Sequence, residues 1–337
     1  RPMFEMAVNG LLSSGQDPQS ANVNMAFVQS MSDHAKDITN VGIGIEVGTT
    51  SSLSVDIWTD IRARELGSDQ KLAMMASRLR HGTVMFSADR ALLNWANDLT
   101  LMAAEKAERA NVSTQAKERI ARLGKLTKAV GVLGQTGAVM SMELYPKAMG
   151  ITAFAGTSDP KAYLNDQREM LKLLADVPGM GSTKVNVGQG DAISAEIESQ
   201  PNMVPPMAQW FKTYGKLTGT IRTEGTDTVA IRLHSGELPE FQTTQINKLS
   251  ELLGNAESEV RLAWAIDVGS IFRWGLSVLG QEARLPKLAS DDTWLTGTLE
   301  RHPLVWKMQM RIPVDQLIKG AAQGSAMRQQ PSTQPSR

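Results

Sequence analysis

The stretch VMSMELYPKAMGITAFAGTSDPKAYLNDQREMLKLLADV, residues 139–177, decides the fold prediction. Apolar or small residues alternate with other residues over Val139–Tyr145 and again over Ile151–Ala155, which predicts two strands. The segment between them contains Pro146 and Gly150, which are typical of a hairpin loop. The spacing therefore predicts an antiparallel strand pair.

A helix is predicted directly after this pair. Ser158 or Asp159 is placed to cap the helix, and Pro160 stands at the first helical position, where its missing N–H leaves no helical bond unmade. The apolar residues that follow recur at helical spacing and form one face: Tyr163, Leu164, Met170, Leu171 and Leu174. The expected local unit is a helix that crosses a sheet.

Similar units are predicted on both sides of this stretch. Further hairpins are expected at 41–47 with 53–57 and at 217–223 with 228–233, and further strands at 83–87, 192–197, 260–265 and 304–310. Helices are expected at 1–36, 70–79, 207–214, 241–253, 269–279 and 313–321, with long helices over 89–130 and a Gly-rich connection at 177–189. The predicted fold class is α+β, with antiparallel sheets made of hairpins and backed by long helices.

Two parts of the chain show the same order of elements. Thr83–Asp89, which leads to Trp95, resembles Arg261–Asp267, which leads to Trp274. The pattern indicates an internal duplication, and both tryptophans are expected to be largely buried where a helix meets the sheet. In this comparison the strand at 140–144 corresponds to the strand at 305–310.

Three aspartates stand at strand-to-helix junctions: Asp89, Asp159 and Asp267. We expect each to cap a helix and to have no catalytic role, because a carboxylate there accepts hydrogen bonds from the first helical turn.

The expected organisation has four parts. Residues 1–40 form a helical N-terminal segment, 41–178 a first hairpin and helix unit, 179–323 a second such unit, and 324–337 a disordered tail rich in Gln, Ser and Pro.

The composition excludes several kinds of site. The 35 basic and 35 acidic residues balance, so no nucleic-acid partner is expected, and the absence of cysteine excludes disulfides and thiolate sites. No apolar run approaches the roughly 20 residues that span a bilayer, so no transmembrane segment is predicted. The sequence begins at Arg1 without Met, which we interpret as a processed product or a fragment.

The motifs predict no catalytic, cofactor-binding or metal-binding residues. The four histidines, His34, His81, His234 and His302, lack the spacing of a metal site. Gly42 with Gly44, and the segment 179–184, lack the order of a phosphate loop and are interpreted as packing and loop glycines.

The charged clusters are interpreted as exposed surface and not as sites. The carboxylate pairs Glu196/Glu198 and Asp291/Asp292, and the basic side of the predicted helix at 103–128, are more typical of solvated faces than of sites.

The segment Ser158–Leu164, read SDPKAYL, opens a helix after a strand pair. In this phrase, and in the alternation of hairpins with long helices over residues 40–320, the chain resembles uncharacterised exported and cell-envelope proteins of planctomycete-like bacteria. The resemblance implies a periplasmic or secreted location, and it carries over no catalytic residue.

These observations favour a non-enzymatic cell-envelope scaffold or binding module, with another envelope protein, a polymer or a lipid as its partner. Two alternatives stay open. A closed apolar cavity between sheet and helices would favour a carrier of an apolar ligand, and buried carboxylates clustered in a cleft would favour a carboxylate-dependent hydrolase.

Overall fold

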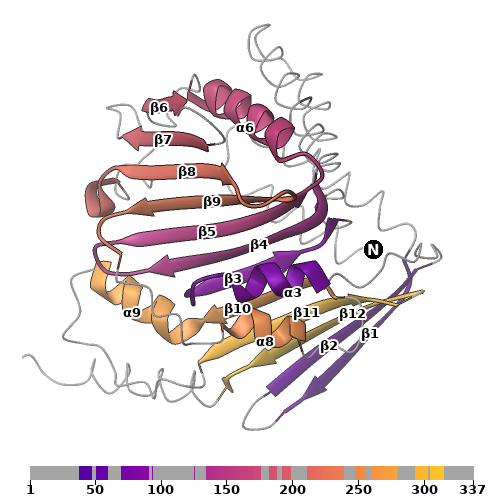
Figure 1. Cartoon of the computed structure of the whole chain (residues 1–337). Coiled ribbons are helices and arrows are strands. Elements are labelled where there is room, and N and C mark those ends of the chain that lie inside the picture. Colours follow the sequence, from indigo (N-terminus) through magenta and orange to yellow (C-terminus); the bar gives the residue numbers. More distant parts are fainter. Residues whose placement is uncertain are drawn as a thin grey trace, which may run out of the picture.

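The described chain is built on one antiparallel sheet of twelve strands (Figure 1). The computed structural model describes residues 38–47, 51–59, 70–90, 93, 125, 134–175, 182–187, 192–198, 211–238, 247–254, 260–278, 293–302 and 304–314. The strand order is β1-β2-β12-β11-β10-β3-β4-β5-β9-β8-β7-β6. Figure 1 shows β1 and β6 at the two ends of the sheet.

The strands are β1 (Ile38–Glu46), β2 (Ser51–Thr59), β3 (Val84–Ala88), β4 (Gly134–Leu144), β5 (Met149–Thr157), β6 (Ser182–Val187), β7 (Ala192–Glu198), β8 (Leu217–Thr223), β9 (Thr228–Ser235), β10 (Val260–Asp267), β11 (Trp294–Arg301) and β12 (Val305–Ile312). The named helices are α3 (Gln70–Ser77), α6 (Pro160–Ala175), α8 (Lys248–Gly254) and α9 (Val268–Val278). None of the described helices is long and apolar enough to span a membrane.

The predicted fold class, α+β with sheets backed by long helices, is wrong. The hairpins join edge to edge into a single sheet, and the four named helices are 7 to 16 residues long. The physical reason is the pairing of β10 with β3, which satisfies the backbone groups that two separate sheets would leave open at their edges. The antiparallel sense of pairing is confirmed by the strand registers.

Two strands escaped prediction. β6 lies inside the segment interpreted as a Gly-rich connection. β11 has Gly297 at its centre, and this glycine interrupts the alternation of apolar residues that predicts a strand. A glycine stands there because the ring of Trp264 on β10 fills the space where a side chain would lie. A Cβ at Gly297 would lie 2.1 Å from that ring, so a neighbouring strand imposes the glycine. The predicted helices at 1–36, and most of those at 89–130, lie outside the described residues.

The central core lies between the sheet and the pair α3 and α8. Met75 of α3, Leu249 of α8, Met85 of β3 and Val139 of β4 are completely buried there. Asn247 joins the two helices: its side-chain oxygen accepts a hydrogen bond from the N–H of Ser250, and its amide donates to carbonyls of the α3 segment. A second cluster forms where α6 packs Tyr163 and Leu164 against the β5, β7, β8 and β9 strands.

The strand order is symmetric about the boundary between β3 and β10. In this comparison β1 corresponds to β8, β2 to β9, β3 to β10, β4 to β11 and β5 to β12. When each strand is replaced by its counterpart, the strand order from β1 to β8 becomes the order from β8 to β1. The helices α3 and α8 occupy equivalent places, each between the second and third strand of its half. An internal duplication would produce this arrangement; the duplication itself stays a prediction.

Backbone hydrogen bonds repeat with the same symmetry. The N–H of Asp89 donates to the carbonyl of Arg261, and the N–H of Asp267 donates to the carbonyl of Thr83, both at 2.8 Å. In the two equivalent hairpin turns, the N–H of Tyr145 donates to Ala148, and that of His302 to Val305. Equivalent positions therefore make equivalent contacts.

The equivalence corrects one correspondence drawn from the sequence. The strand at 140–144 belongs to β4, whose equivalent is β11 and not the strand at 305–310. The sequence comparison matched the strand at 140–144 with the strand after its true equivalent, because β11 was not predicted.

The predicted boundaries at 40, 178 and 323 stay a prediction. The two central ranges are joined by hydrogen-bonded pairs: β12 pairs with β2, and β5 pairs with β9.

Two of the three predicted aspartate caps are confirmed. The carboxylate of Asp159 accepts a hydrogen bond from the N–H of Ala162, and that of Asp267 accepts one from the N–H of Ser270, each at 3.0 Å. The carboxylate of Asp89 is ion-paired with Arg261, and residues 91 and 92, whose N–H groups it would cap, lie outside the described residues.

Candidate functional site

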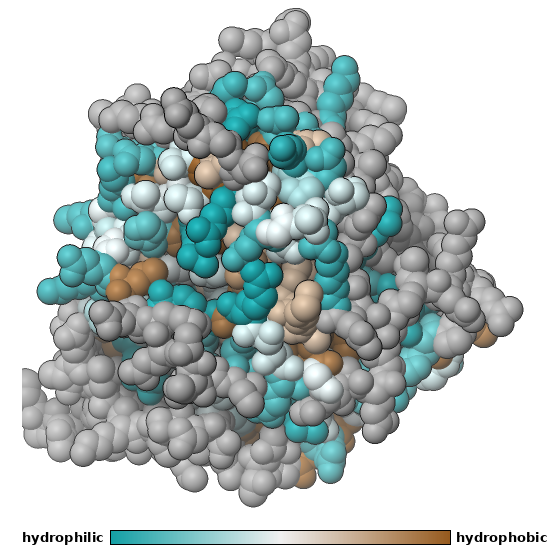
Figure 2. Space-filling model, viewed as in Figure 1, coloured by the Kyte–Doolittle hydropathy of each residue, from teal (hydrophilic) through white to brown (hydrophobic). Residues whose placement is uncertain are grey.

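A pocket of about 510 Å³ lies between helix α9, the start of β3 and the β4–β5 turn. It is lined by His81, Gly82, Thr83, Glu143, Leu144, Tyr145, Pro146, Asp267, Ser270, Arg273, Trp274 and Ser277. These residues come from three separate parts of the chain, which the sheet brings together. In Figure 2, seen from the side shown in Figure 1, the described surface is largely hydrophilic and its hydrophobic patches are small.

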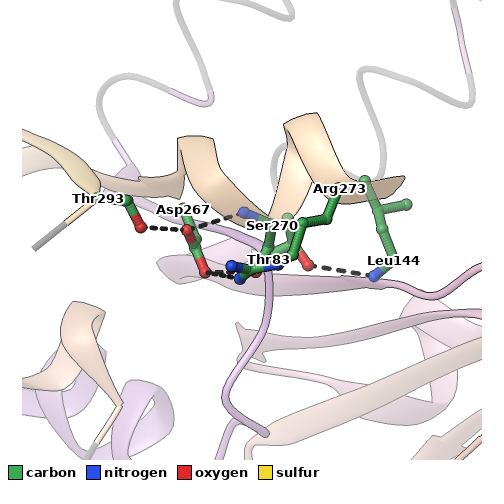
Figure 3. A network of polar contacts seen from close by, with 6 residues as sticks. All are labelled: Thr83, Leu144, Asp267, Ser270, Arg273 and Thr293. Carbon is green, nitrogen blue, oxygen red and sulfur yellow. Dashed lines mark hydrogen bonds and ion pairs between the residues drawn. The ribbon is translucent and has the colours of Figure 1, made fainter. Parts of the chain in front are cut away.

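Asp267 organises one wall of the pocket (Figure 3). One carboxylate oxygen accepts hydrogen bonds from the hydroxyl of Thr293, at 2.7 Å, and from the N–H of Ser270. The other oxygen accepts the hydroxyl of Ser270 and lies 3.9 Å from the guanidinium of Arg273. Arg273 also donates to the Ser270 hydroxyl at 2.9 Å. This network fixes the first turn of α9 against the sheet.

The pKa of Asp267 is held below its ordinary value. Burial acts in the opposite direction and would raise the pKa, but the hydrogen bonds from Ser270 and Thr293, together with the positive charge of Arg273, lower it by more. The carboxylate is therefore ionised at neutral pH and engaged with donors on both oxygens.

Glu143 also lines the pocket. Its side chain is only 2% exposed; one oxygen lies 3.1 Å from the guanidinium of Arg80, and the other accepts a hydrogen bond from the hydroxyl of Tyr145 at 3.2 Å. Burial raises the pKa of Glu143, although Arg80 and the Tyr145 hydroxyl act to lower it. Burial also raises the pKa of Tyr145, and the charge of Glu143 adds to this effect.

Aromatic side chains complete the pocket. The ring of His81 packs edge-on against Trp294 with their centres 5.3 Å apart, and desolvation lowers the pKa of His81 although Asp267 acts to raise it. Trp274 is partly buried, and its indole N–H donates to the hydroxyl of Tyr214. The other predicted tryptophan anchor, Trp95, lies outside the described residues.

The lining of the pocket is closely packed at Gly82, which lies against β4. A Cβ at this glycine would lie 2.1 Å from the hydroxyl of Ser141 and 2.8 Å from the carbonyl of Met142. The hydroxyl of Ser141 donates to the carbonyl of Arg80, so it cannot move away without losing that bond. The site therefore requires a glycine next to His81.

The two halves of the sheet carry different residues at the positions equivalent to this pocket. The position of Thr83 is taken in the second half by Arg261, and that of Leu144 by Arg301, and both arginines are buried. Arg261 forms an ion pair with Asp89, the equivalent of Asp267. Burial lowers the pKa of Arg301, and the neighbouring charge of Arg261 lowers it further. The same framework thus carries an ion pair in one half and a pocket in the other.

Most residues weighed in the sequence do not take part in the site. Glu196 of the pair Glu196/Glu198 is ion-paired with Lys216 on the surface of the sheet, at 2.8 Å. His302 lies 3.6 Å from Glu300, and His234 lies in the sheet opposite Gly150 and Thr218. His34, Asp291 and Asp292, and the basic segment 103–128 apart from Lys125, lie outside the described residues.

Sequence reasoning missed His81, Glu143 and Arg273 as members of one site. Glu143 was counted among the alternating residues of a strand, and nothing in the sequence placed it beside α9. One signal was present: in the sequence, Glu143 and Pro146 have the same spacing as Glu300 and Pro303 in the second half. Among the described residues, no three His, Asp or Glu side chains are grouped so that they could hold a metal ion.

The chain shows little similarity to known proteins. No family model matches it, and no curated protein matches it. One solved structure, titled crystal form III of TP0453, a Treponema protein, is similar over 74% of this chain and 97% of its own, with 10% sequence identity and a TM-score of 0.31.

Proposed function

We propose that the protein is a non-enzymatic binding module of the cell envelope that holds a small polar ligand in the pocket beside α9. One observation carries the proposal: Arg273 and Trp274, neighbours on α9, line the same pocket as Glu143 and Tyr145. Its volume of about 510 Å³ is in the range of small-molecule sites, and it combines ring faces with a few charged groups. The envelope setting is supported only by the resemblance of residues 40–320.

Binding fits the carboxylates better than catalysis does. Asp267 has donors on both oxygens and caps a helix, so it is poorly placed to take up or release a proton. Most of the lining surface of the pocket is apolar, so the ligand would pair an apolar part with a polar group that reaches Arg273.

The ligand class is tested with a defined panel of amino acids, monosaccharides and nucleosides. Binding is followed by the indole N–H resonances in NMR spectra and then by calorimetry. We expect at least one class to shift the Trp274 signal, which is assigned by its loss in Trp274→Phe. Arg273→Gln should weaken that binding at least tenfold, because it removes the charged donor that faces the pocket.

The matched control is Trp306→Phe, which changes a partly buried tryptophan on β12 that does not line the pocket. It should leave the affinity unchanged. A panel in which no compound perturbs Trp274, or a ligand whose affinity is the same in Arg273→Gln, would rule out this pocket as the binding site.

A carboxylate-dependent hydrolase is the second candidate, and one observation favours it. Glu143 and Asp267 line one pocket, and their pKa values are shifted in opposite directions, as in acid and base pairs of enzymes. Incubation with p-nitrophenyl glycosides and esters tests this candidate. Turnover that disappears in Glu143→Gln while the fold persists would replace the binding proposal with an enzyme; no turnover would leave binding alone.

A further inference from the structure

The edge strand β1 exposes a row of apolar side chains. Val41, Ile43, Ile45 and Val47 point to the same side of the strand, and they are 50%, 68%, 71% and 83% exposed. Within the described residues, β1 pairs only with β2, so its other edge meets no described strand; the N–H of Val41 is bonded to the side chain of Asn40. An exposed strand of this kind, without Lys, Arg or Pro, is a template for another strand.

The other half of the molecule shows what such an edge accommodates. β8 is the equivalent of β1, and its outer edge is covered by β7 in antiparallel register. Ile45 and Ile221 occupy equivalent positions, because each lies opposite an equivalent residue, Leu53 and Ile231. Ile221 is 7% exposed beside Ile193 of β7 and under α6, whereas Ile45 is 71% exposed. The two isoleucines therefore differ in what covers them: β7 and α6 cover Ile221, and no described element covers Ile45 in the equivalent way.

We propose that the outer edge of β1 pairs with β1 of a second copy of this chain, which joins the two sheets across a two-fold axis at Ile43. In this antiparallel register Ile43 faces its own counterpart, Val41 faces Ile45, and Gly42 faces Gly44. Apolar side chains then meet apolar side chains on one side of the joined sheet. On the other side Gly42 faces Gly44, next to the Trp58 ring and the Ser54 hydroxyl of each copy's own β2.

Charge also permits this register. Glu46 is the only charged residue of β1, and it would face Asn40 of the other copy, so no like charges are opposed. Glu46 already accepts a hydrogen bond from Ser52 within its own chain. A two-fold contact uses the same surface on both copies and closes after two chains, which is the commonest form of oligomer.

The full chain is examined by sedimentation velocity across micromolar concentrations, with Ile43→Lys as the test variant. The wild type is expected to sediment as a dimer of the 36.6-kDa chain. Ile43→Lys should be monomeric, with its dissociation constant raised at least tenfold, because it places two ammonium groups on the axis. Met74→Lys is the matched control, since Met74 is an exposed apolar residue on α3, and it should remain dimeric.

A cross-link gives an independent measurement, because the chain contains no cysteine. Ile43→Cys should form a disulfide-linked dimer under mild oxidation, since directly opposed strand residues lie within disulfide distance, and Met74→Cys should not. A monomeric wild type, a concentration-dependent filament, or a dimer that withstands Ile43→Lys without an Ile43→Cys cross-link would each overturn the proposal.

Discussion

Phe86 on β3 lies directly opposite Trp264 on β10 at the junction between the two halves of the sheet. The two residues are equivalent in the halves, so the axis that relates them passes through this pair. Neighbouring pairs extend outward with the same symmetry, which explains how segments 178 positions apart, at 86 and 264, come to share a hydrogen-bonded ladder. The junction also brings Asp89 beside Arg261 and Asp267 beside Thr83.

The buried pair Arg261–Asp89 at this junction should be sensitive to the loss of one partner. Both side chains are about 5% exposed, and Arg261→Met would leave the Asp89 carboxylate without its ion pair inside the sheet. We expect a loss of roughly 3–5 kcal/mol in the free energy of unfolding, measured with urea. Lys172→Met, which breaks the exposed Lys172–Glu169 pair, is the control and should change stability little. Equal effects of the two substitutions would show that the junction pair has no special weight.

Asn247 should not be replaceable by the nearly isosteric aspartate. Asn247→Asp keeps an oxygen that can accept the N–H of Ser250, but it replaces the amide donor with an acceptor that faces the carbonyls of Ala76 and Leu79. We expect a cost of roughly 1–3 kcal/mol, because buried carbonyls lose their donor. Asp159→Asn, at an exposed cap, is the reverse exchange and should cost less than about 0.5 kcal/mol. A thermal melt of each variant checks the contrast, and an Asn247→Asp variant as stable as the wild type would contradict the proposed link between α3 and α8.

Substitutions at Gly137 and Gly225 should distinguish the cost of a strained backbone conformation from the cost of a steric clash. Both have positive φ, at 101° and 77°, but a Cβ at Gly137 would lie 2.3 Å from the carbonyl oxygen of Ala88, whereas nothing lies within 4 Å of a Cβ at Gly225. Gly225→Ala should therefore cost only the conformational term, about 1–2 kcal/mol. Gly137→Ala should cost distinctly more in denaturant titrations, because β3 has to move. An equal loss of unfolding free energy in the two variants would mean that β3 can move away from β4 at little cost.

The pH dependence of stability should report on Asp267. Because its pKa in the folded state is below the value of about 3.9 in an unfolded chain, Asp267 adds stability above about pH 4 that is lost as the pH falls through the folded-state pKa. Asp267→Asn should therefore be less stable than the wild type at neutral pH and should approach it at low pH. Asp166→Asn is the control of opposite sign, since burial raises the pKa of Asp166. Parallel stability curves for wild type and Asp267→Asn between pH 2 and pH 7, an interval that spans roughly the titration of carboxylates, would contradict the assigned network.

Local chemistry was enough to predict the β1–β2, β4–β5 and β8–β9 hairpins and the start of α6. The turn at Pro146 and the alternation on both sides of it predict β4 and β5, and the order Asp159-Pro160 predicts the start of α6, because these signals act between residues a few positions apart. The resemblance between 83–89 and 261–267 also followed from the sequence, and the structure places those segments as paired strands.

Tertiary structure alone decided which hairpins join and where the pocket lies. Backbone hydrogen bonds between strands carry no side-chain identity, so the pairing of β10 with β3, or of β12 with β2, could not be deduced from either strand. Gly297 shows the same limit: the residue looks like an interruption until the ring of Trp264 is seen to fill its place. Glu143 and Asp267 meet in one pocket because the sheet brings together the turn of one half and the helix of the other, and that proximity follows from the fold, not from spacing along the chain.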